Sequence, residues 1–166
     1  MQNIKQLMLS YASYHRDPRN KATHFVGVPL IVYALFVALS WLRIDFWETL
    51  PVPVTGATIF FAAIITHYLR LDLVLTVIQL PFSLALLFLA EKTALLPFPT
   101  SLMLFLGAFI GGWIIQLIGH YFEGKKPALV DNIMQVFNAP LFLAMEIAFA
   151  IGLCSDLRGD IEASKP

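Results

Sequence analysis

The chain has 166 residues, of which 58% are hydrophobic and only 13% are charged, and its 11 basic and 11 acidic side chains give a formal net charge of zero. Soluble domains carry about 25% charged residues, so this composition excludes an ordinary soluble protein and predicts a single integral membrane domain over residues 1–166. The zero net charge gives no basic surface for nucleic acid. The single cysteine, Cys154, excludes an intramolecular disulfide and a cysteine-rich metal site.

An amphipathic helix is predicted at the N-terminus. Apolar or aromatic side chains recur there at helical spacing, at Ile4, Leu7, Met8, Tyr11 and Tyr14. This pattern is typical of a helix that lies in the membrane interface. We expect Pro18 to end the helix, because proline removes a backbone donor. Residues 1–23 are therefore predicted to form an interfacial helix followed by a polar loop.

Five apolar segments follow, each close to the roughly 20 residues that a helix needs to cross the hydrocarbon core. They lie near 25–43, 53–69, 72–90, 101–121 and 132–154. Residues 155–166 are predicted to form a short polar tail. The sequence thus predicts an all-α, multi-pass transmembrane helical bundle of about five spans, with the N-terminal helix at its surface.

Lysine and arginine counts predict the orientation of this bundle. With the N-terminus in the cytoplasm, seven basic residues fall on the cytoplasmic side and four on the opposite side. The seven are Lys5, Arg16, Arg19, Lys21, Arg70, Lys125 and Lys126. Because cytoplasmic loops carry an excess of basic residues, we expect the N-terminus in the cytoplasm.

All four histidines fall at one face of the predicted bundle. His15 precedes the first segment, His24 begins it, and His67 and His120 end the second and fourth segments. Neutral imidazole binds iron, zinc, copper and nickel, and ionisable residues within a membrane are functional candidates. The clustering predicts a metal site at the cytoplasmic face, with His67 as a fourth ligand inferred from topology.

Polar side chains near His120 are predicted to support it. Gln116, His120 and Glu123 share one helix face by their spacing. Glu123 is either a ligand itself or an acceptor that fixes the tautomer of His120, and we favour the second role. Asp131 begins the last apolar segment, and we expect it, like Gln116, to lie behind the ligands.

Two further features of this region have more than one interpretation. Lys125 and Lys126 follow the fourth segment, where they could enforce orientation, bind a lipid phosphate or fatty carboxylate, or do both. Within that segment, Gly107-x3-Gly111 and Ala108-x3-Gly112 form a small-residue face. Such a face lets another helix approach closely, within the chain or across a homodimer.

Two long motifs carry a resemblance to a known family. The first is Tyr11-x3-His15-x4-Asn20-Lys21-x2-His24-x2-Gly27-Val28-Pro29. The second is Gln116-x2-Gly119-His120-x2-Glu123-Gly124-Lys125-x-Pro127-Ala128. Together they resemble the membrane family of the yeast 2-hydroxy fatty acid dioxygenase. The resemblance runs from the N-terminal helix into the last apolar segment.

The resemblance implies an Fe(II)-dependent enzyme that uses O2 to convert a 2-hydroxy fatty acid into the acid one carbon shorter. His15, His24 and His120 match the histidines of the family motifs. Histidine at position 67 is less usual in the family. The polar neighbours in the motifs match as well, namely Asn20, Lys21, Glu123 and Lys125. The resemblance implies residence in the endoplasmic reticulum for a eukaryotic source, and a bacterial source would imply the inner membrane.

From these residues we expect catalytic roles for Asn20, Lys21 and Glu123, and substrate contacts from Lys125 and Lys126. The expected partners are a 2-hydroxy fatty acid, O2 and membrane lipid, with a homodimer left open. Three other functions remain open from sequence. They are a bis-histidine haem protein that passes electrons, a small transporter with a proton relay through Glu146, and a metal-free assembly protein.

Overall fold

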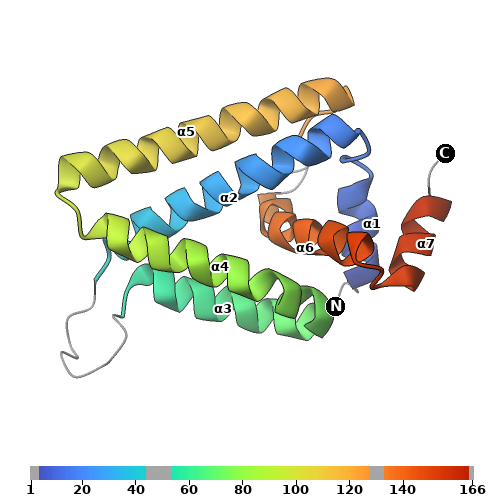
Figure 1. The fold of residues 1–166 in the computed structure, drawn as a ribbon, viewed down its shortest axis with the longest axis horizontal. Coiled ribbons are helices and arrows are strands. Elements are labelled where there is room, and N and C mark those ends of the chain that lie inside the picture. Colours follow the sequence, from blue (N-terminus) through green and yellow to red (C-terminus); the bar gives the residue numbers. More distant parts are fainter. Residues whose placement is uncertain (1–3, 44–53, 128–132, 165–166) are drawn as a thin grey trace.

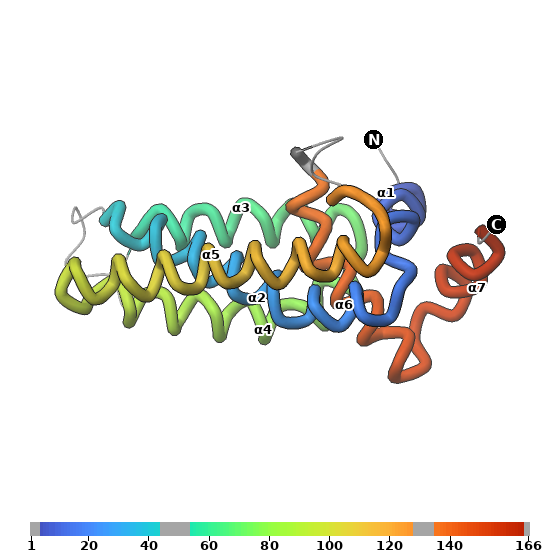
Figure 2. The backbone as a smooth tube through the Cα atoms, turned by 90° about the horizontal axis from the view of Figure 1, so that it is seen from above, coloured from blue at the N-terminus to red at the C-terminus, as the bar shows by residue number. Residues whose placement is uncertain are grey.

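The computed structural model describes residues 4–43, 54–127 and 133–164, and within them every regular element is helical, as the sequence predicts. The elements are α1 (Ile4–Ala12), α2 (Pro18–Ser40), α3 (Gly56–Leu71), α4 (Leu73–Ala94), α5 (Phe98–Glu123), the 3-10 helix η2 (Ile133–Asn138), α6 (Ala139–Ala150) and α7 (Ser155–Ala163). The four longest helices, α2 to α5, form an elongated bundle (Figure 1). The short helices α1, α6 and α7 gather at the end of the bundle where α2 begins and α5 ends (Figures 1 and 2).

The start of α2 differs from its prediction. We expected Pro18 to end the N-terminal helix, but α1 stops at Ala12 and Pro18 occupies the first turn of α2. Proline is favourable there, because the first N–H groups of a helix need no partner within the helix and the fixed φ suits it. The Asp17 side chain caps the new helix by accepting from the Arg19 amide at 2.8 Å. The predicted loop is therefore shorter, and His24 lies on a helix.

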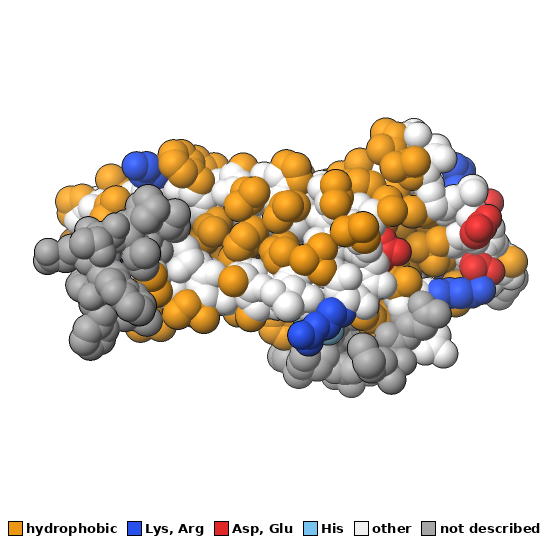
Figure 3. All heavy atoms as spheres, turned by 90° about the horizontal axis from the view of Figure 1, so that it is seen from below, with side chains coloured by type: hydrophobic (Ala, Val, Ile, Leu, Met, Phe, Trp, Pro, Cys, Tyr) orange, Lys and Arg blue, Asp and Glu red, His pale blue; other side chains and the backbone are white. Residues whose placement is uncertain are grey.

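Among the described residues, the helices α2, α4 and α5 are each long and apolar enough to cross a membrane. The bent pair of Gln135–Ala150 and Ser155–Ala163 passes the same test only when the two helices are taken together. Helix α3 has 16 residues, which gives about 24 Å of helix against a hydrocarbon core of about 30 Å. On the face shown in Figure 3, hydrophobic side chains are spread along the bundle, whereas acidic ones lie toward one end. This distribution suits a chain whose long helices lie in lipid.

The fifth predicted segment does not form one continuous helix. Within 132–154 the structure has η2 and then the 12-residue helix α6, and α7 follows at a bend of 106°. The chain bends at Gly152 and Cys154, which both have positive φ. Most apolar side chains of helix α6 are buried in the protein. A helix of this length more often lies in a core than across a bilayer.

The predicted polar tail is also partly helical. Helix α7 lies against α1, where Lys5 Nζ and an Asp160 carboxylate oxygen are 2.7 Å apart. The N-terminal and C-terminal helices thus lie at the same end of the bundle (Figure 1).

Helices α2 and α5 approach each other closely through glycines. A Cβ on Gly112 would lie 2.8 Å from Ile31 Cγ1 and 3.1 Å from the Gly27 carbonyl oxygen. The Gly112 side of the predicted small-residue face therefore packs within the chain. Gly107 and Gly111, by contrast, have nothing within 4 Å of such a Cβ among the described residues.

Candidate metal centre

Three of the four histidines converge at the end of the bundle where α2 begins. His15 comes from the segment after α1, His24 from α2 and His120 from α5. One ring nitrogen of each lies within 4.8 Å of the other two, and all three residues are buried. Their ring centroids are 4.3 to 5.2 Å apart. The structure thus brings together the three histidines that the motifs singled out.

Backbone carbonyls orient two of these rings. Nδ1 of His15 lies 2.8 Å from the Tyr11 carbonyl oxygen, and Nδ1 of His24 lies 2.8 Å from the Asn20 carbonyl oxygen. A carbonyl can only accept, so each Nδ1 carries the proton, and in the neutral ring the lone pair is then on Nε2. These two Nε2 atoms face each other at 2.9 Å.

Two facing lone pairs repel unless a cation lies beside them. Burial, with the neighbouring His24 as the next cause, lowers the pKa of His15 to about 2, so this ring is neutral at neutral pH. His120 adds a buried Nδ1 that has no hydrogen-bond partner. Nitrogens bound at about 2.0–2.1 Å to one ion, at right angles, would lie about 2.9 Å apart. The three imidazoles therefore fit a transition-metal ion.

Aromatic rings fix the position of His15. The Tyr11 ring stacks on it with centroids 4.2 Å apart and an angle of 6° between the planes. On the other side, Phe142 of α6 lies 5.3 Å from the His15 ring by centroids. A stacked and buried ring has few alternative rotamers, so the His15 side chain is fixed in one position although its backbone lies in a loop. The i, i+4 spacing of Tyr11 and His15 was a signal in the sequence, whereas nothing there pointed to Phe142.

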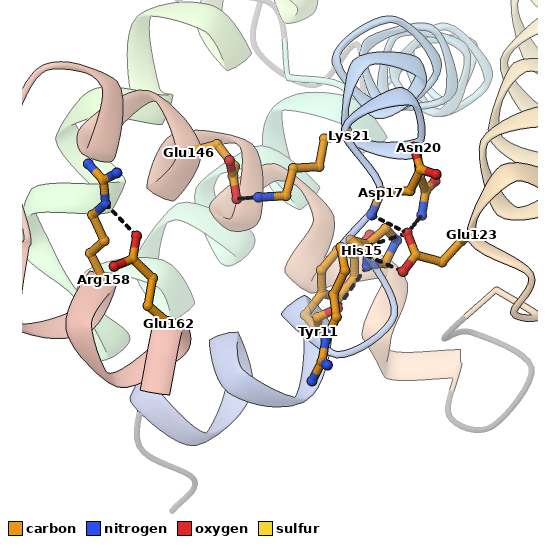
Figure 4. Close-up of polar contacts among 10 residues, drawn as sticks. Tyr11, His15, Asp17, Asn20, Lys21, Glu123, Glu146, Arg158 and Glu162 are labelled. Carbon is orange, nitrogen blue, oxygen red and sulfur yellow. Dashed lines mark hydrogen bonds and ion pairs between the residues drawn. The ribbon is translucent and has the colours of Figure 1, made fainter. Parts of the chain in front are cut away.

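Glu123 has partners that the sequence did not predict. Its carboxylate accepts from three groups that precede or begin α2 (Figure 4). The donors are the Arg16 amide at 2.9 Å to both oxygens, the Asp17 amide at 2.7 Å and Asn20 Nδ2 at 3.1 Å. The end of α5, which carries His120, is thereby tied to the segment that carries His15.

We predict that Glu123→Gln lowers metal affinity by about 10–100-fold, the usual cost of losing a group that orients ligands. An amide keeps one acceptor oxygen but turns an NH2 group toward backbone donors, so the segment that carries His15 should loosen. The measurement is titration of the purified variant with Fe(II) and Co(II). A matched control is Glu162→Gln, since Glu162 pairs with Arg158 on the exposed side of α7. Metal loss as complete as in a histidine variant would make Glu123 a ligand, and unchanged affinity would remove its positioning role.

Asn20 supports the same arrangement. Its side chain is fully buried and donates to the Tyr14 carbonyl at 3.1 Å as well as to Glu123. Its backbone carbonyl accepts from His24. Asn20 therefore orients the neighbours of the metal centre and does not line the cavity that contains it.

The three lysines predicted to act in catalysis or on substrate do not line the cavity, and two of them have other partners. Lys21 forms an ion pair with Glu146 at 2.6 Å (Figure 4), which gives Glu146 of α6 a structural partner. Lys125 donates to the Ser13 carbonyl at 2.8 Å, and Lys126 is exposed. None of these lysines lines the cavity described below, so their positions do not support the predicted contacts with a substrate carboxylate.

Two further predicted residues lie outside the cluster. His67 is exposed on α3 and is not among the grouped histidines, so the structure does not support the fourth ligand that topology predicted. Topology correctly placed the end of α3 near the metal centre, but depth does not determine which way a side chain points. Asp131 lies outside the described residues.

The three histidines line one part of an apolar cavity of about 870 Å³, which includes the open space at its mouth. Apolar residues of α2, α3, α5, η2 and α6 form most of its wall. They include Val28, Ile31, Val32, Leu35, Phe36, Phe60, Ile64, Trp113, Val136, Phe137, Ala139 and Pro140.

Few polar groups face this cavity. Gln116 lines it one helical turn before His120, and its buried Oε1 has no hydrogen-bond partner. Gln79 and Ser83 of α4 also line it, with Gln79 Nε2 donating to Ser83 Oγ at 2.6 Å. No lysine or arginine is among the described residues of the lining. The sequence pointed to Gln116 by its spacing from His120 but gave no indication of the α4 pair.

Comparison with known proteins agrees with these observations. A family model described as "2-hydroxy-palmitic acid dioxygenase Mpo1-like" matches residues 1–151. The chain is 30% identical over 154 residues to the Saccharomyces cerevisiae protein named 2-hydroxy-palmitic acid dioxygenase MPO1. The alignment covers 92% of this chain and 83% of the yeast protein. No solved structure matches the chain. By the family match and this identity, the chain belongs to the Mpo1-like family.

Proposed function

We propose that this protein is an Fe(II)-dependent membrane dioxygenase that converts a 2-hydroxy fatty acid into the fatty acid one carbon shorter. The observation that carries the proposal is the pair of facing Nε2 atoms of His15 and His24, 2.9 Å apart, beside His120 in the wall of an apolar cavity. The yeast relative's name supplies the reaction class. His15, His24 and His120 would hold the iron, which supplies the capacity to bind and activate O2.

The absence of cationic side chains from the described lining bears on substrate choice. A carboxylate that enters an apolar cavity must be paired, and an ion held by the three histidines would supply the positive charge. A 2-hydroxy acid offers two oxygens to one ion, whereas a plain fatty acid lacks the hydroxyl. The unpaired Gln116 Oε1 lies one turn from His120, where it could accept a hydrogen bond from the hydroxyl group of the substrate.

The overall reaction balances with one O2 as the oxidant and needs no further co-reactant. A 2-hydroxy acid and one O2 give the shortened acid, CO2 and water, so the bond between the carboxyl carbon and the hydroxyl-bearing carbon is broken. Glu123 and Asn20 would keep the histidines in place, and Tyr11 would hold the His15 ring. The apolar wall would exclude water from the reacting end of the chain.

The positions of the charged residues favour one orientation in the membrane. The basic residues of α1, the start of α2, the ends of α3 and α5, and α7 lie at the end of the bundle with the histidines. In the described residues the opposite end holds Arg43 and Lys92. By the positive-inside rule, we place the metal centre and both terminal helices on the cytoplasmic side.

The same distance argues against His15 and His24 as the two ligands of one haem. Two axial nitrogens on opposite sides of one iron, each about 2.0–2.1 Å away, would lie about 4 Å apart. The observed 2.9 Å between the His15 and His24 nitrogens is instead the spacing of neighbouring ligands. No room for a porphyrin plane is left between these two rings.

The proposal predicts that iron-loaded protein in air converts 2-hydroxypalmitate to pentadecanoate and does not turn over palmitate. The physical reason is that the hydroxyl adds a second oxygen ligand in a cavity without cationic side chains. Mass spectrometry of the acids measures this, and a ferrous chelator should abolish the product. If a folded, iron-loaded sample gives no shortened acid from any long-chain 2-hydroxy acid, the proposed activity is wrong.

A further inference from the structure

The cavity runs along α2, as the α2 residues in its wall show. His24, Val28, Ile31, Val32, Leu35 and Phe36 line it. Their spacing puts them on one face of the helix. Phe36 follows His24 by 12 residues, which corresponds to about 18 Å along the axis. The cavity therefore extends from the histidines for about three turns of α2.

The wall on α3 ends beside Phe36, and the wall on α5 ends closer to the histidines. Helix α3 runs opposite to α2 (Figure 1), so Tyr68 lies toward the histidines and Phe60 lies away from them. On α5, Trp113 is the lining residue farthest from His120, about 10 Å before it along the helix. Beyond Phe36 and Phe60, toward the opposite end of the bundle, no described residue of α2 or α3 lines the cavity.

Two aromatic rings stand at that end. Phe36 and Phe60 form an edge-to-face pair with centroids 6.4 Å apart. Phe36 is only 2% exposed and belongs to a core cluster with Val37, Ala57 and Ala90. A ring held in this way cannot move aside easily, because packed interiors have little free space.

The length of the cavity matches one long acyl chain. The acyl chains of one lipid leaflet fill about half of a 30 Å hydrocarbon core, or about 15 Å, against about 18 Å from His24 to Phe36. We propose that the Phe36–Phe60 pair is the end wall of an acyl-chain subsite and sets the longest chain that the site accepts. This inference rests on the proposed function, because it assumes that the carboxyl end of the substrate lies at the histidines.

The proposal predicts how selection depends on chain length. Each methylene buried in the cavity adds about fourfold in affinity. The preference should therefore rise with length until the chain reaches Phe60, and longer chains should gain nothing or be rejected. Removing the Phe60 ring should let the preference keep rising for longer chains. Filling the cavity nearer the histidines should make the preference stop rising at a shorter chain length.

The experiment is an internal competition. An equimolar mixture of saturated 2-hydroxy acids, from 2-hydroxydecanoate to 2-hydroxyeicosanoate, is incubated with iron-loaded protein, and early products are quantified by mass spectrometry. Phe60→Ala should shift the favoured length upward and raise the relative use of the longest acids about fourfold for each added methylene that fits. Val32→Phe, which adds a ring one turn before Phe36, should shift it downward.

Phe61→Ala is the matched control. Phe61 lies at a similar distance from Phe36, with centroids 6.3 Å apart, and packs against the same cluster, but it does not line the cavity. Its profile should match that of the unsubstituted protein. Anaerobic binding of the same acids to the iron-loaded proteins gives a second readout without turnover.

The outcomes separate this inference from the proposed function. An unchanged length profile in both Phe60→Ala and Val32→Phe, with products still formed, would overturn the end wall and leave the activity standing. A shift of equal size in Phe61→Ala would also overturn it, since the effect would then come from packing. No product from any acid in the unsubstituted protein would overturn the proposed function itself.

Discussion

His120→Ala should abolish both metal binding and product formation, and the same result is expected for His15→Ala and His24→Ala. Each removes one of three nitrogens that lie within 4.8 Å of one another. Two remaining imidazoles leave an incomplete site, so the loss should exceed the roughly 10–100-fold that accompanies removal of a group outside the ligand set. Metal analysis and the 2-hydroxypalmitate assay, applied to each variant, measure the two effects.

His67→Ala is the matched control for these three variants. It removes an imidazole at the same end of the bundle, but His67 is exposed on α3 and lies outside the cluster. It should keep its metal and its activity. Full metal occupancy in His120→Ala, or metal loss in His67→Ala, would contradict the ligand assignment.

Gly119→Ala should damage the same centre without touching a ligand. A Cβ at this position would overlap Thr23 Oγ1 and would lie 2.6 Å from Asn20 Oδ1, so we expect α5 to move away from α2 or the Thr23 and Asn20 side chains to lose their present positions. Overpacking of this kind costs about 1–3 kcal/mol of stability. Because His120 follows directly on α5 and His24 lies on α2, a shift of about 1 Å should lower activity by about 100-fold.

Gly111→Ala provides the comparison, since nothing lies within 4 Å of a Cβ there. It should fold and turn over substrate as the unsubstituted protein does. Thermal unfolding, metal titration and product formation on both variants test the prediction. If the two alanine variants behave alike, close approach of α2 and α5 is not what holds the histidines together.

The long apolar helices and the ligand triad could be predicted from the sequence for definite physical reasons. Length and hydropathy mark a membrane helix regardless of its neighbours, and α2, α4 and α5 were found in this way. His15, His24 and His120 could be found because each lies near the end of a predicted apolar segment. The segments alternate in direction, so these ends meet at one face.

What the sequence did not predict depends on contacts between distant segments. Helix α6 is as apolar as a membrane span, but it is buried against other helices, and hydropathy cannot distinguish these two environments. Glu123 shares a helix face with His120, yet its partners are amides of Arg16 and Asp17, more than 100 residues away in sequence. His67 lies at the predicted end of the bundle, but its side chain is exposed and is not grouped with the other three histidines.

The measurement that tests the central claim most directly is the metal content of the unsubstituted protein, purified through a tag that binds no metal. The account predicts about one iron per chain after reconstitution with Fe(II) under anaerobic conditions, no haem absorption, and loss of this iron in His120→Ala. Active protein that holds no metal, or an absorption spectrum of bis-histidine haem, would contradict it.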